Sequence, residues 1–594
     1  MMLKATTLLL AATFPVAFGG DEDDRINAFF EEMFQEELAA KPMDQTELGL
    51  RENYDKWNDF SEAGRKADLL RDKRALGRLW TEFDYDALGR QAKVSYRLFE
   101  KRCQDAIEEH EWYYYDYPVN QMFGMHTWLV SFLMNMHQIE DVADAQAYIK
   151  RLATIDEPIE QVILTMRECE KRGVVPPRFV FDHVLRDCRN ILSGAPFSED
   201  ESSSSIFTDF LGKLDGLELD TEQKNTLVDE AIKAMSGSMQ PAYEALIDEL
   251  ERQQAIATED DGCWKFPEGA AFYTWSLQQR TTTNLSAAEI HALGLSEVAR
   301  IHGEMEAIRE QVGFEGDLPA FFEHLRVDSK FYYPDTDEGR AAYLAEAKRI
   351  VDGMTARLDE FFITKPKAEM IVKAVEPYRE RSAGKAFYQS GAPDGSRPGV
   401  YYANLYDMGA MPIYQMEALA YHEGTPGHHM QVSIAQELEG IPQFRQHTFH
   451  TAYGEGWALY TEHFPKEFGF YEDPYSDFGR LAMQLWRACR LVVDTGLHHL
   501  RWTRQEAIDY LMRNTPNPES DCVKAIERYI VMPGQATAYQ IGMLRILELR
   551  ERARTELGDA FSIAEFHDVL LTNGSVPLSM LEEFVDEWIA SKKD

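Results

Sequence analysis

The stretch from which the rest of the chain can be interpreted is Tyr421-His422-Glu423-Gly424-Thr425-Pro426-Gly427-His428-His429-Met430-Gln431. Histidine is the commonest protein ligand for zinc, and a glutamate beside the first ligand can serve as a general base. In the H-E-x-x-H pattern, two histidines four residues apart share one helix face and one zinc ion. This chain departs from that pattern, because the fourth residue after His422 is Pro426 and the next histidine is His428.

The spacing of the histidines predicts a break in the helix. In a straight helix, a residue six positions on points about 120° away, so that His428 could not share a metal with His422. His429 faces the right way but lies roughly 10 Å along the axis, too far for two bonds of about 2.0–2.1 Å. Pro426 and Gly427 both interrupt helices. We therefore predict a distorted helix between Glu423 and His428; the alternative is a helix end with surface histidines.

Composition indicates a folded protein with a large core. The chain has 594 residues, of which 44% are hydrophobic and 12% aromatic, which argues against disorder. Its formal net charge is −40. A polyanion of this kind is repelled by nucleic acid and by anionic membranes, so we expect neither as a partner.

The first residues resemble an export signal. Lys4 is followed by the apolar run Ala5 to Phe18, and Ala17-Phe18-Gly19 is a small-x-small cleavage site. We predict a signal peptide over 1–19 and a periplasmic or secreted protein; the alternative is a buried N-terminal helix. No cysteine lies at the cleavage site and no later segment reaches about 18 uninterrupted apolar residues, so no membrane anchor is expected.

The pattern of apolar residues predicts a mainly helical, all-α protein. Helical spacing recurs at 25–38, 94–111, 142–152 and 157–172, and the clearest extended or hairpin segment is 385–404. No linker divides the chain, so 20–594 are predicted to form one domain with the metal site in 401–540. Six scattered cysteines (Cys103, Cys169, Cys188, Cys263, Cys489 and Cys522) could be disulfide-bonded or buried thiols.

A second motif follows His428 by about thirty residues. It reads E-G-W-A-x-Y-x-E from Glu455 to Glu462 and matches the segment from which zinc aminopeptidases of the gluzincin group take their third ligand. The match nominates Glu455, whose alternative role is a carboxylate at the start of a helix. With His422 and His428 it would give Zn²⁺ three protein ligands and one open position for water.

With these motifs the chain resembles the bacterial family named domain of unknown function 885 (DUF885), grouped with zinc metallopeptidases. The family pattern H-E-x-x-P-G-H-x-x-Q is present from His422 to Gln431, and the resemblance covers essentially the whole mature chain. It implies a large, bilobed helical fold with a deep central cleft and a minor β hairpin or sheet, similar to neurolysin and angiotensin-converting enzyme. It also implies that His428 rather than His429 is the ligand, with His429 and Gln431 in supporting roles.

Peptide hydrolysis also needs a base and a donor to the developing oxyanion. Glu423 is the predicted general base, which would polarise the metal-bound water. His498, Tyr539 and Tyr529 are the candidate donors; packing in the core is the alternative for the tyrosines.

Two kinds of substrate contact are also expected from the sequence. Arg528 and Arg501 could bind a substrate carboxylate. The segment Tyr401-Tyr402-Ala403-Asn404 could pair with a peptide as an edge strand.

The sequence thus predicts an exported zinc metallopeptidase acting on short peptides. Two alternatives stay open: a non-catalytic peptide-binding or scaffold protein of the same fold, and a zinc amidase or esterase on another substrate. The oligomeric state, the peptide's length and sequence, and the choice among aminopeptidase, carboxypeptidase, dipeptidase and endopeptidase action are left undetermined.

Overall fold

Helices dominate the structure, a computed structural model that describes residues 21–199, 202–376, 380, 383–391 and 397–593. The predicted mainly helical fold is confirmed, with one small sheet. The predicted signal peptide, 1–19, lies outside the described residues. None of the helices in the described ranges is both long and apolar enough to cross a bilayer.

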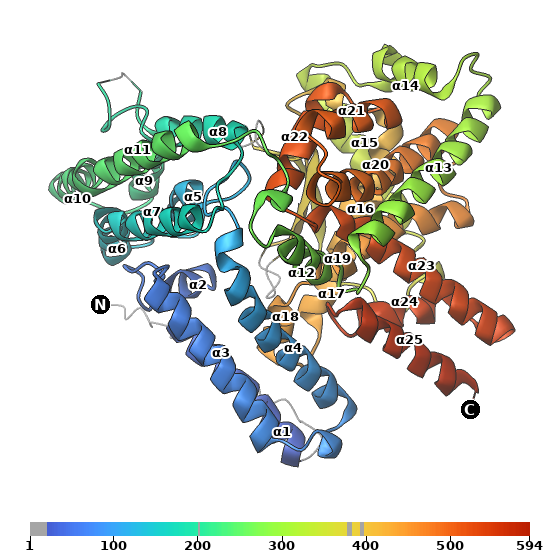
Figure 1. Ribbon diagram of the computed structural model, residues 1–594, viewed down its shortest axis with the longest axis horizontal. Coiled ribbons are helices and arrows are strands. Elements are labelled where there is room, and N and C mark those ends of the chain that lie inside the picture. Colours follow the sequence, from blue (N-terminus) through green and yellow to red (C-terminus); the bar gives the residue numbers. More distant parts are fainter. Residues whose placement is uncertain (1–20, 200–201, 377–379, 381–382, 392–396, 594) are drawn as a thin grey trace, which may run out of the picture.

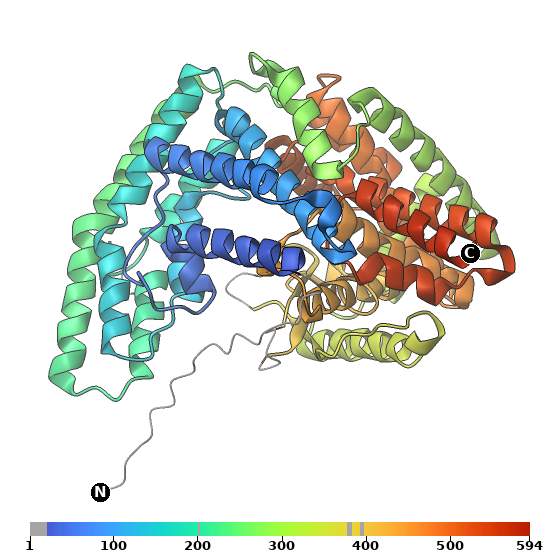
Figure 2. The same cartoon turned by 90° about the horizontal axis from the view of Figure 1, so that it is seen from below.

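The helices of the N-terminal half gather on the left of Figure 1, coloured blue to green. They are α1 (Asp21–Ala39), α2 (Pro42–Glu47), α3 (Glu62–Glu82), α4 (Arg90–Trp112), α5 (Met125–Asn135), α6 (Val142–Ala153), α7 (Asp156–Lys171), α8 (Arg178–Ile191), α9 (Ser205–Asp215), α10 (Thr221–Ala234) and α11 (Gln240–Ile256). Figure 2 shows α10 and α11 at the outer side of this half.

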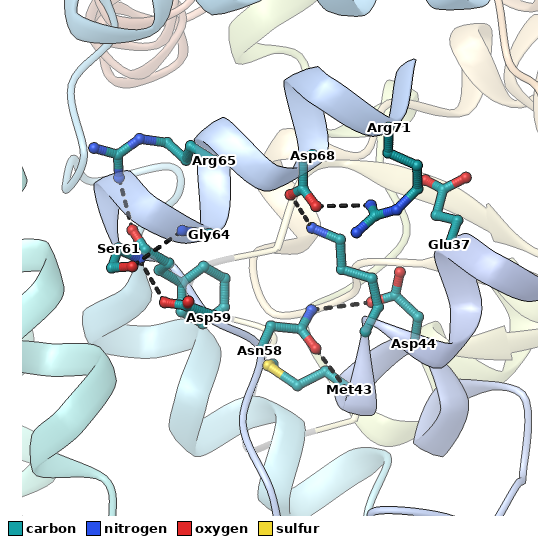
Figure 3. Close-up of polar contacts among 12 residues, drawn as sticks. Glu37, Met43, Asp44, Asn58, Asp59, Ser61, Gly64, Arg65, Asp68 and Arg71 are labelled. Carbon is teal, nitrogen blue, oxygen red and sulfur yellow. Dashed lines mark hydrogen bonds and ion pairs between the residues drawn. The ribbon is translucent and has the colours of Figure 1, made fainter. Parts of the chain in front are cut away.

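Polar contacts fix the connection between α2 and α3, residues 48–61 (Figure 3). The side chain of Asn58 accepts a hydrogen bond from the Met43 backbone N–H at 2.8 Å and donates one to Asp44 at 3.2 Å. The Ser61 hydroxyl caps α3 by accepting from the Gly64 N–H at 3.1 Å. Such caps satisfy backbone donors that a helix leaves unpaired in its first turn.

The C-terminal half lies on the right of Figure 1 and carries the motifs singled out above. Its helices are α12 (Gly269–Thr281), α13 (Ala287–Gln311), α14 (Leu318–Val327), α15 (Asp337–Thr355), α16 (Met416–Glu423), α17 (His428–Glu437), α18 (Gln443–His447), α19 (Thr451–His463), α20 (Pro474–His498), α21 (Arg504–Asn514), α22 (Glu519–Val531), α23 (Ala538–Leu557), α24 (Ile563–Leu571) and α25 (Leu578–Lys593).

The sheet contains the predicted hairpin and one further strand. Its order is β1 (Met370–Ala374), β3 (Gly399–Ala403), β2 (Ala386–Gln389); β2 and β3 are antiparallel, whereas β1 runs parallel to β3. The prediction that 401–404 forms an edge strand for peptides is therefore wrong. Tyr401 and its neighbours are paired with a strand on each side, so their backbone N–H and C=O groups are not available to a peptide.

One hydrophobic core runs through both halves, from Ile26 to Ile589. Phe444 of α18 joins them, with its ring centroid 5.2 Å from that of Phe30 in α1 and 5.4 Å from that of Phe99 in α4. All six cysteines are buried free thiols, which resolves the alternative left open by the sequence.

Candidate metal centre

The helix that carries the first histidine ends immediately after it. Helix α16 stops at Glu423, the Thr425–Pro426 bond is cis, and α17 begins at His428 after Gly427. The predicted distortion between Glu423 and His428 is thus confirmed as a complete break. Gly427 is required there by space, because a Cβ atom on it would lie 2.0 Å from the His422 carbonyl oxygen.

Helix α19 holds this break from the other side. The Trp457 indole N–H donates to the Pro426 carbonyl at 3.0 Å, and the Thr461 hydroxyl donates to the Tyr421 carbonyl at 3.1 Å. Both acceptors lie where α16 can no longer provide an intrahelical partner. The second motif therefore does more than supply Glu455 as a candidate ligand. Its Trp457 and Thr461 side chains also fix the backbone of the first motif.

The three predicted ligands come together. His422 Nε2 lies 3.7 Å from Glu455 Oε2, and His428 Nε2 lies 3.4 Å from the same oxygen. One donor atom from each residue falls within 4.8 Å of the others. The two imidazole rings meet edge to face with centroids 4.8 Å apart. The break thus gives His428 the place that an i+4 histidine takes on an unbroken helix.

These residues fit a zinc ion. Glu455 Oε2 is buried and accepts no hydrogen bond within the described part of the chain, although both Nε2 atoms face it. Ligand atoms held at about 2.0–2.1 Å from a tetrahedral zinc lie about 3.4 Å apart, close to the spacings observed. Two imidazoles and one carboxylate are also the donor set of many zinc enzymes.

A fourth residue, to which the sequence analysis did not assign a role, bonds the first candidate ligand. Glu462 Oε1 lies 2.7 Å from His422 Nδ1, and the Glu462 side chain is 1% exposed. Metal-binding histidines usually donate their second N–H to such a partner. Its sequence signal was available: Glu462 follows Glu455 by seven residues, two helical turns along the same face of α19.

The histidines and carboxylates of this cluster shift one another's pKa values. Burial disfavours the imidazolium of His422, but its contacts with Glu455 and Glu462 outweigh burial and raise its pKa to about 10. Burial opposes the charged form of Glu455 as well, yet the two histidines hold its pKa well below the usual range. A metal cation bound between these groups would balance the charge of the Glu455 carboxylate in place of the proton on the histidine.

Glu423 is adjacent to the cluster and free to act. It is the last residue of α16, 6% exposed, and its carboxylate forms no hydrogen bond or ion pair with any described residue. The cluster is partly exposed to solvent, since the His428 and Glu455 side chains keep 14% and 17% of their surface exposed.

The structure assigns the supporting histidine and glutamine differently from our expectation. His429 turns away from the cluster, with Nδ1 3.1 Å from the Tyr388 hydroxyl of β2, and burial lowers its pKa to about 4. Gln431 forms no bond to either imidazole, and its Oε1 is buried without a partner among the described residues. Its expected role belongs to Glu462 because α19, and not the next turn of α17, faces His422 Nδ1.

His498 is not available as an oxyanion donor. It is 2% exposed; its Nδ1 accepts the Cys263 backbone N–H at 3.1 Å and its Nε2 donates to the Tyr529 carbonyl at 3.0 Å. Burial lowers its pKa to about 4, so the ring is neutral and both nitrogens are committed. The prediction that His498 donates to an oxyanion conflicts with this geometry. The His498 side chain instead positions the backbone of Tyr529.

The two candidate tyrosines lie together on a buried arginine that the sequence analysis did not single out. The Arg490 guanidinium carbon is 4.5 Å from the ring centroid of Tyr539 and 5.7 Å from that of Tyr529. Burial lowers the pKa of Arg490, but its interactions with the two tyrosines and with Glu455 outweigh burial and raise the pKa. Arg490 therefore interacts electrostatically with one of the candidate ligands. Tyr529 and Tyr539 thus share one buried guanidinium, whose charge interacts with that of Glu455.

The chain resembles a bacterial protein family and solved structures over most of its length. A family described as "Bacterial protein of unknown function (DUF885)" matches residues 42–585. A crystal structure from Colwellia psychrerythraea, described as a "putative lipoprotein", superposes with a TM-score of 0.88 at 31% identity, covering 96% of this chain and 100% of that one. A "putative lipoprotein of unknown function" from Shewanella oneidensis gives 0.73 at 16% identity, covering 93% and 98%. No curated protein matches the chain.

Proposed function

The chain belongs to the DUF885 family, and from its metal-site geometry we propose that it is an exported, zinc-dependent metallopeptidase that hydrolyses short peptides. The observation that carries the proposal is the convergence of His422, His428 and Glu455 beside an unengaged Glu423. Bound zinc would acidify water and polarise a carbonyl group. The three residues would hold it and leave a tetrahedral position open.

Glu423 acts as the general base. Its carboxylate takes a proton from the water that attacks the carbonyl carbon, and the same proton can pass to the leaving amine as the C–N bond breaks. A base must be free of competing partners and near the reacting atoms, and Glu423, next to His422 in sequence, has no partner among the described residues. The two other carboxylates described at the cluster do not fit the role, since Glu455 and Glu462 are engaged by the histidines.

Tyr539 donates to the developing oxyanion. Among the described residues its hydroxyl accepts a long hydrogen bond of 3.5 Å from the Gln535 amide and lies beside the Arg490 guanidinium; both are donors, so its own proton remains available to a substrate oxygen. Its ring is fixed against Arg490, which limits the motion of the hydroxyl. A donor held in place before the reaction stabilises charge without reorganisation at the moment it develops.

The substrate class follows from access to the site. The His422 side chain is 4% exposed, so its reactive face lies below the surface, where short or unfolded peptides reach more easily than folded proteins. Export is supported by the predicted signal peptide and by the description of the Colwellia protein as a putative lipoprotein. Both suggest an envelope or extracellular setting.

Metal content and product mapping test the proposal. We expect about one zinc ion per purified chain, lost in His428→Ala and Glu455→Ala. His429→Ala is the matched control: a neighbouring histidine, more deeply buried, that binds Tyr388 and should leave zinc bound. Mass-spectrometric mapping of a peptide library digested by the zinc-loaded protein should show defined cleavages. Zinc retained by His428→Ala but lost from His429→Ala would overturn the ligand assignment, and no cleavage of any peptide would overturn the activity.

A further inference from the structure

Helix α20 carries an unusual row of buried polar side chains. Arg480, Gln484, Arg487 and Arg490 are 5%, 2%, 7% and 9% exposed, and they recur at steps of three and four residues in a helix whose buried residues are mostly apolar. Such spacing places them along one side of the helix. Each also has at least one buried polar atom without a hydrogen-bond partner in the described part of the chain. Buried polar atoms of this kind usually have partners, so their number here calls for an explanation.

This side of α20 borders the metal centre. Arg487 Nη2 lies 3.5 Å from Glu462 Oε1, the same oxygen that bonds His422. Arg490 follows one turn later on α20, and its charge interacts with that of Glu455, which precedes Glu462 by two turns on α19. Positions advance along α20 as they retreat along α19, so the order of the helices places Arg490 toward Glu455 as Arg487 is placed toward Glu462.

Arg490 differs from its neighbours because it lacks an acid. Arg480 pairs with Asp477 at 2.8 Å and Arg487 with Glu462, whereas Arg490 forms no ion pair with any described carboxylate. Its Nε and Nη1 are buried and unpartnered. Arginine stays charged when buried, and a buried charge without a counter-ion is costly. The structure retains that cost beside the candidate metal centre, where a ligand could remove it.

A second unpartnered donor stands beside this guanidinium. The Tyr529 hydroxyl is buried and donates to no described residue, and the Arg490 guanidinium beside it is itself a donor. His498 fixes the Tyr529 backbone through its carbonyl. Arg490 of α20 and Tyr529 of α22 thus present two neighbouring hydrogen-bond donors that one acceptor could satisfy. The arginines expected from sequence are otherwise engaged: Arg528 donates to Gln535 at 2.9 Å, and Arg501 is exposed, over Trp264.

We propose that Arg490 and Tyr529 bind the free C-terminal carboxylate of the peptide substrate, so that the enzyme releases a short fragment from the carboxyl end. This inference rests on the proposed function. Water adds across the scissile bond: its hydroxyl goes to the carbonyl carbon and its proton to the amine of the departing fragment. Guanidinium groups pair with carboxylates through two parallel hydrogen bonds, and a permanent carboxylate balances a permanent charge.

The charge of the whole molecule supports the need for such a receptor. With a formal net charge of −40, the protein repels an anionic substrate at long range. A local, desolvated arginine can reverse this preference at the site because charges interact more strongly away from water. The oxyanion needs no further donor, since Tyr539 is assigned to it.

Matched peptides test the inference. An N-acetylated pentapeptide and its C-terminal amide differ only in the charge that Arg490 would bind. For zinc-loaded wild type at pH 7.5, we expect amidation to lower kcat/KM about 100-fold, the effect of losing charge-assisted hydrogen bonds to a buried partner. Arg490→Gln should lower kcat/KM for the acid to that for the amide, mainly through KM. Arg490→Lys should keep part of the preference.

Arg480→Gln is the matched control, since it removes a buried arginine from the same helix that already has its acid. The acid-to-amide ratio should stay as in wild type. This ratio is independent of the folded fraction, so a loss of stability in any variant does not affect it. Equal kcat/KM for acid and amide in wild type would overturn the inference, as would an Arg490→Gln variant that loses kcat equally on both.

Failure of the proposed function gives a different result. If no peptide is cleaved, calorimetric titration of the zinc-loaded Glu423→Gln protein with the same two peptides still decides the question. Tighter binding of the acid by about 100-fold, abolished when Arg490→Gln is added, would support the receptor without peptidase activity. Equal affinity for the two peptides, or binding of neither, would overturn it.

Discussion

Glu462 Oε1 lies 2.7 Å from His422 Nδ1, an arrangement that turns Nε2 of the same ring toward Glu455. The bond fixes both the orientation of the imidazole and the nitrogen that is left for a metal. Glu462 is itself held by Arg487 at 3.5 Å. Glu462 of α19 and Arg487 of α20 therefore hold the candidate ligand His422 in its orientation.

Removing the charge of Glu462 should weaken metal binding without removing a ligand. Glu462→Gln keeps the size of the side chain but loses the carboxylate that holds the Nδ1 proton, and we expect zinc affinity to fall about 10- to 100-fold. Competition with a chromogenic chelator measures it. Glu472→Gln, an exposed change nearby, is the control. Unchanged affinity in Glu462→Gln would show that this contact does not orient the ligand.

The break between α16 and α17 should tolerate no side chain at Gly427. A Cβ atom there would lie 2.0 Å from the His422 carbonyl oxygen, so Gly427→Ala must displace one of the two histidine-bearing segments. We expect a loss of zinc affinity of at least tenfold and a lower Tm, because the site is well packed. Gly212→Ala, in α9 with nothing within 4 Å of the added atom, should leave Tm equal or slightly higher.

Normal zinc binding by the Gly427→Ala protein would contradict this account of the break. Zinc binding and Tm should both be recorded, since a fall in Tm alone would show only that the helix ends are packed.

The sequence was sufficient to predict the break and the convergence of His422, His428 and Glu455. Pro426 and Gly427 fall between the two histidines, and backbone rules alone require the helix to end there. Local rules failed where a second segment decides the outcome. His498 was expected to face the substrate, but a backbone N–H at Cys263 and a carbonyl at Tyr529 capture both its nitrogens. Contacts between residues so distant in sequence leave no periodic signal.

The sheet illustrates the same limit. Tyr401 was placed correctly in a strand by its aromatic neighbours and flanking glycines, yet the parallel pairing with β1 made that strand central. Arg490 is different, because a signal was present: Arg480, Gln484 and Arg487 interrupt an apolar helix at steps of four and three. A polar row on a buried helix indicates either internal partners or a ligand, and it could have been recognised from sequence.

Buried histidines should make the protein unstable in acid. His567 is fully buried, with Nε2 2.8 Å from the Tyr460 hydroxyl and Nδ1 2.9 Å from the Phe361 carbonyl, and burial lowers its pKa to about 3. The unfolded chain takes up this proton near pH 6.5, the native state only near pH 3. Stability is therefore complete above pH 6.5 and is lost as pH falls toward 3, by at most about 1.4 kcal/mol per pH unit for each such histidine.

Thermal unfolding between pH 7 and pH 4 measures this loss. Tm should fall steadily with pH, and His567→Gln, which keeps hydrogen-bonding groups but cannot titrate, should fall less steeply. His499→Gln, at an exposed position, should follow wild type. A Tm that is constant from pH 7 to pH 4, or an equal slope in His567→Gln, would refute the assignment.

The central claim is that Glu423 activates water at a zinc ion held by His422, His428 and Glu455. The most direct test compares peptide hydrolysis by wild type and Glu423→Gln, each shown to carry the same amount of zinc. Loss of a general base typically costs about 10²- to 10⁴-fold, so we predict that kcat falls by at least 100-fold while zinc content and peptide affinity stay unchanged. Hydrolysis by zinc-loaded Glu423→Gln at the wild-type rate would contradict the account.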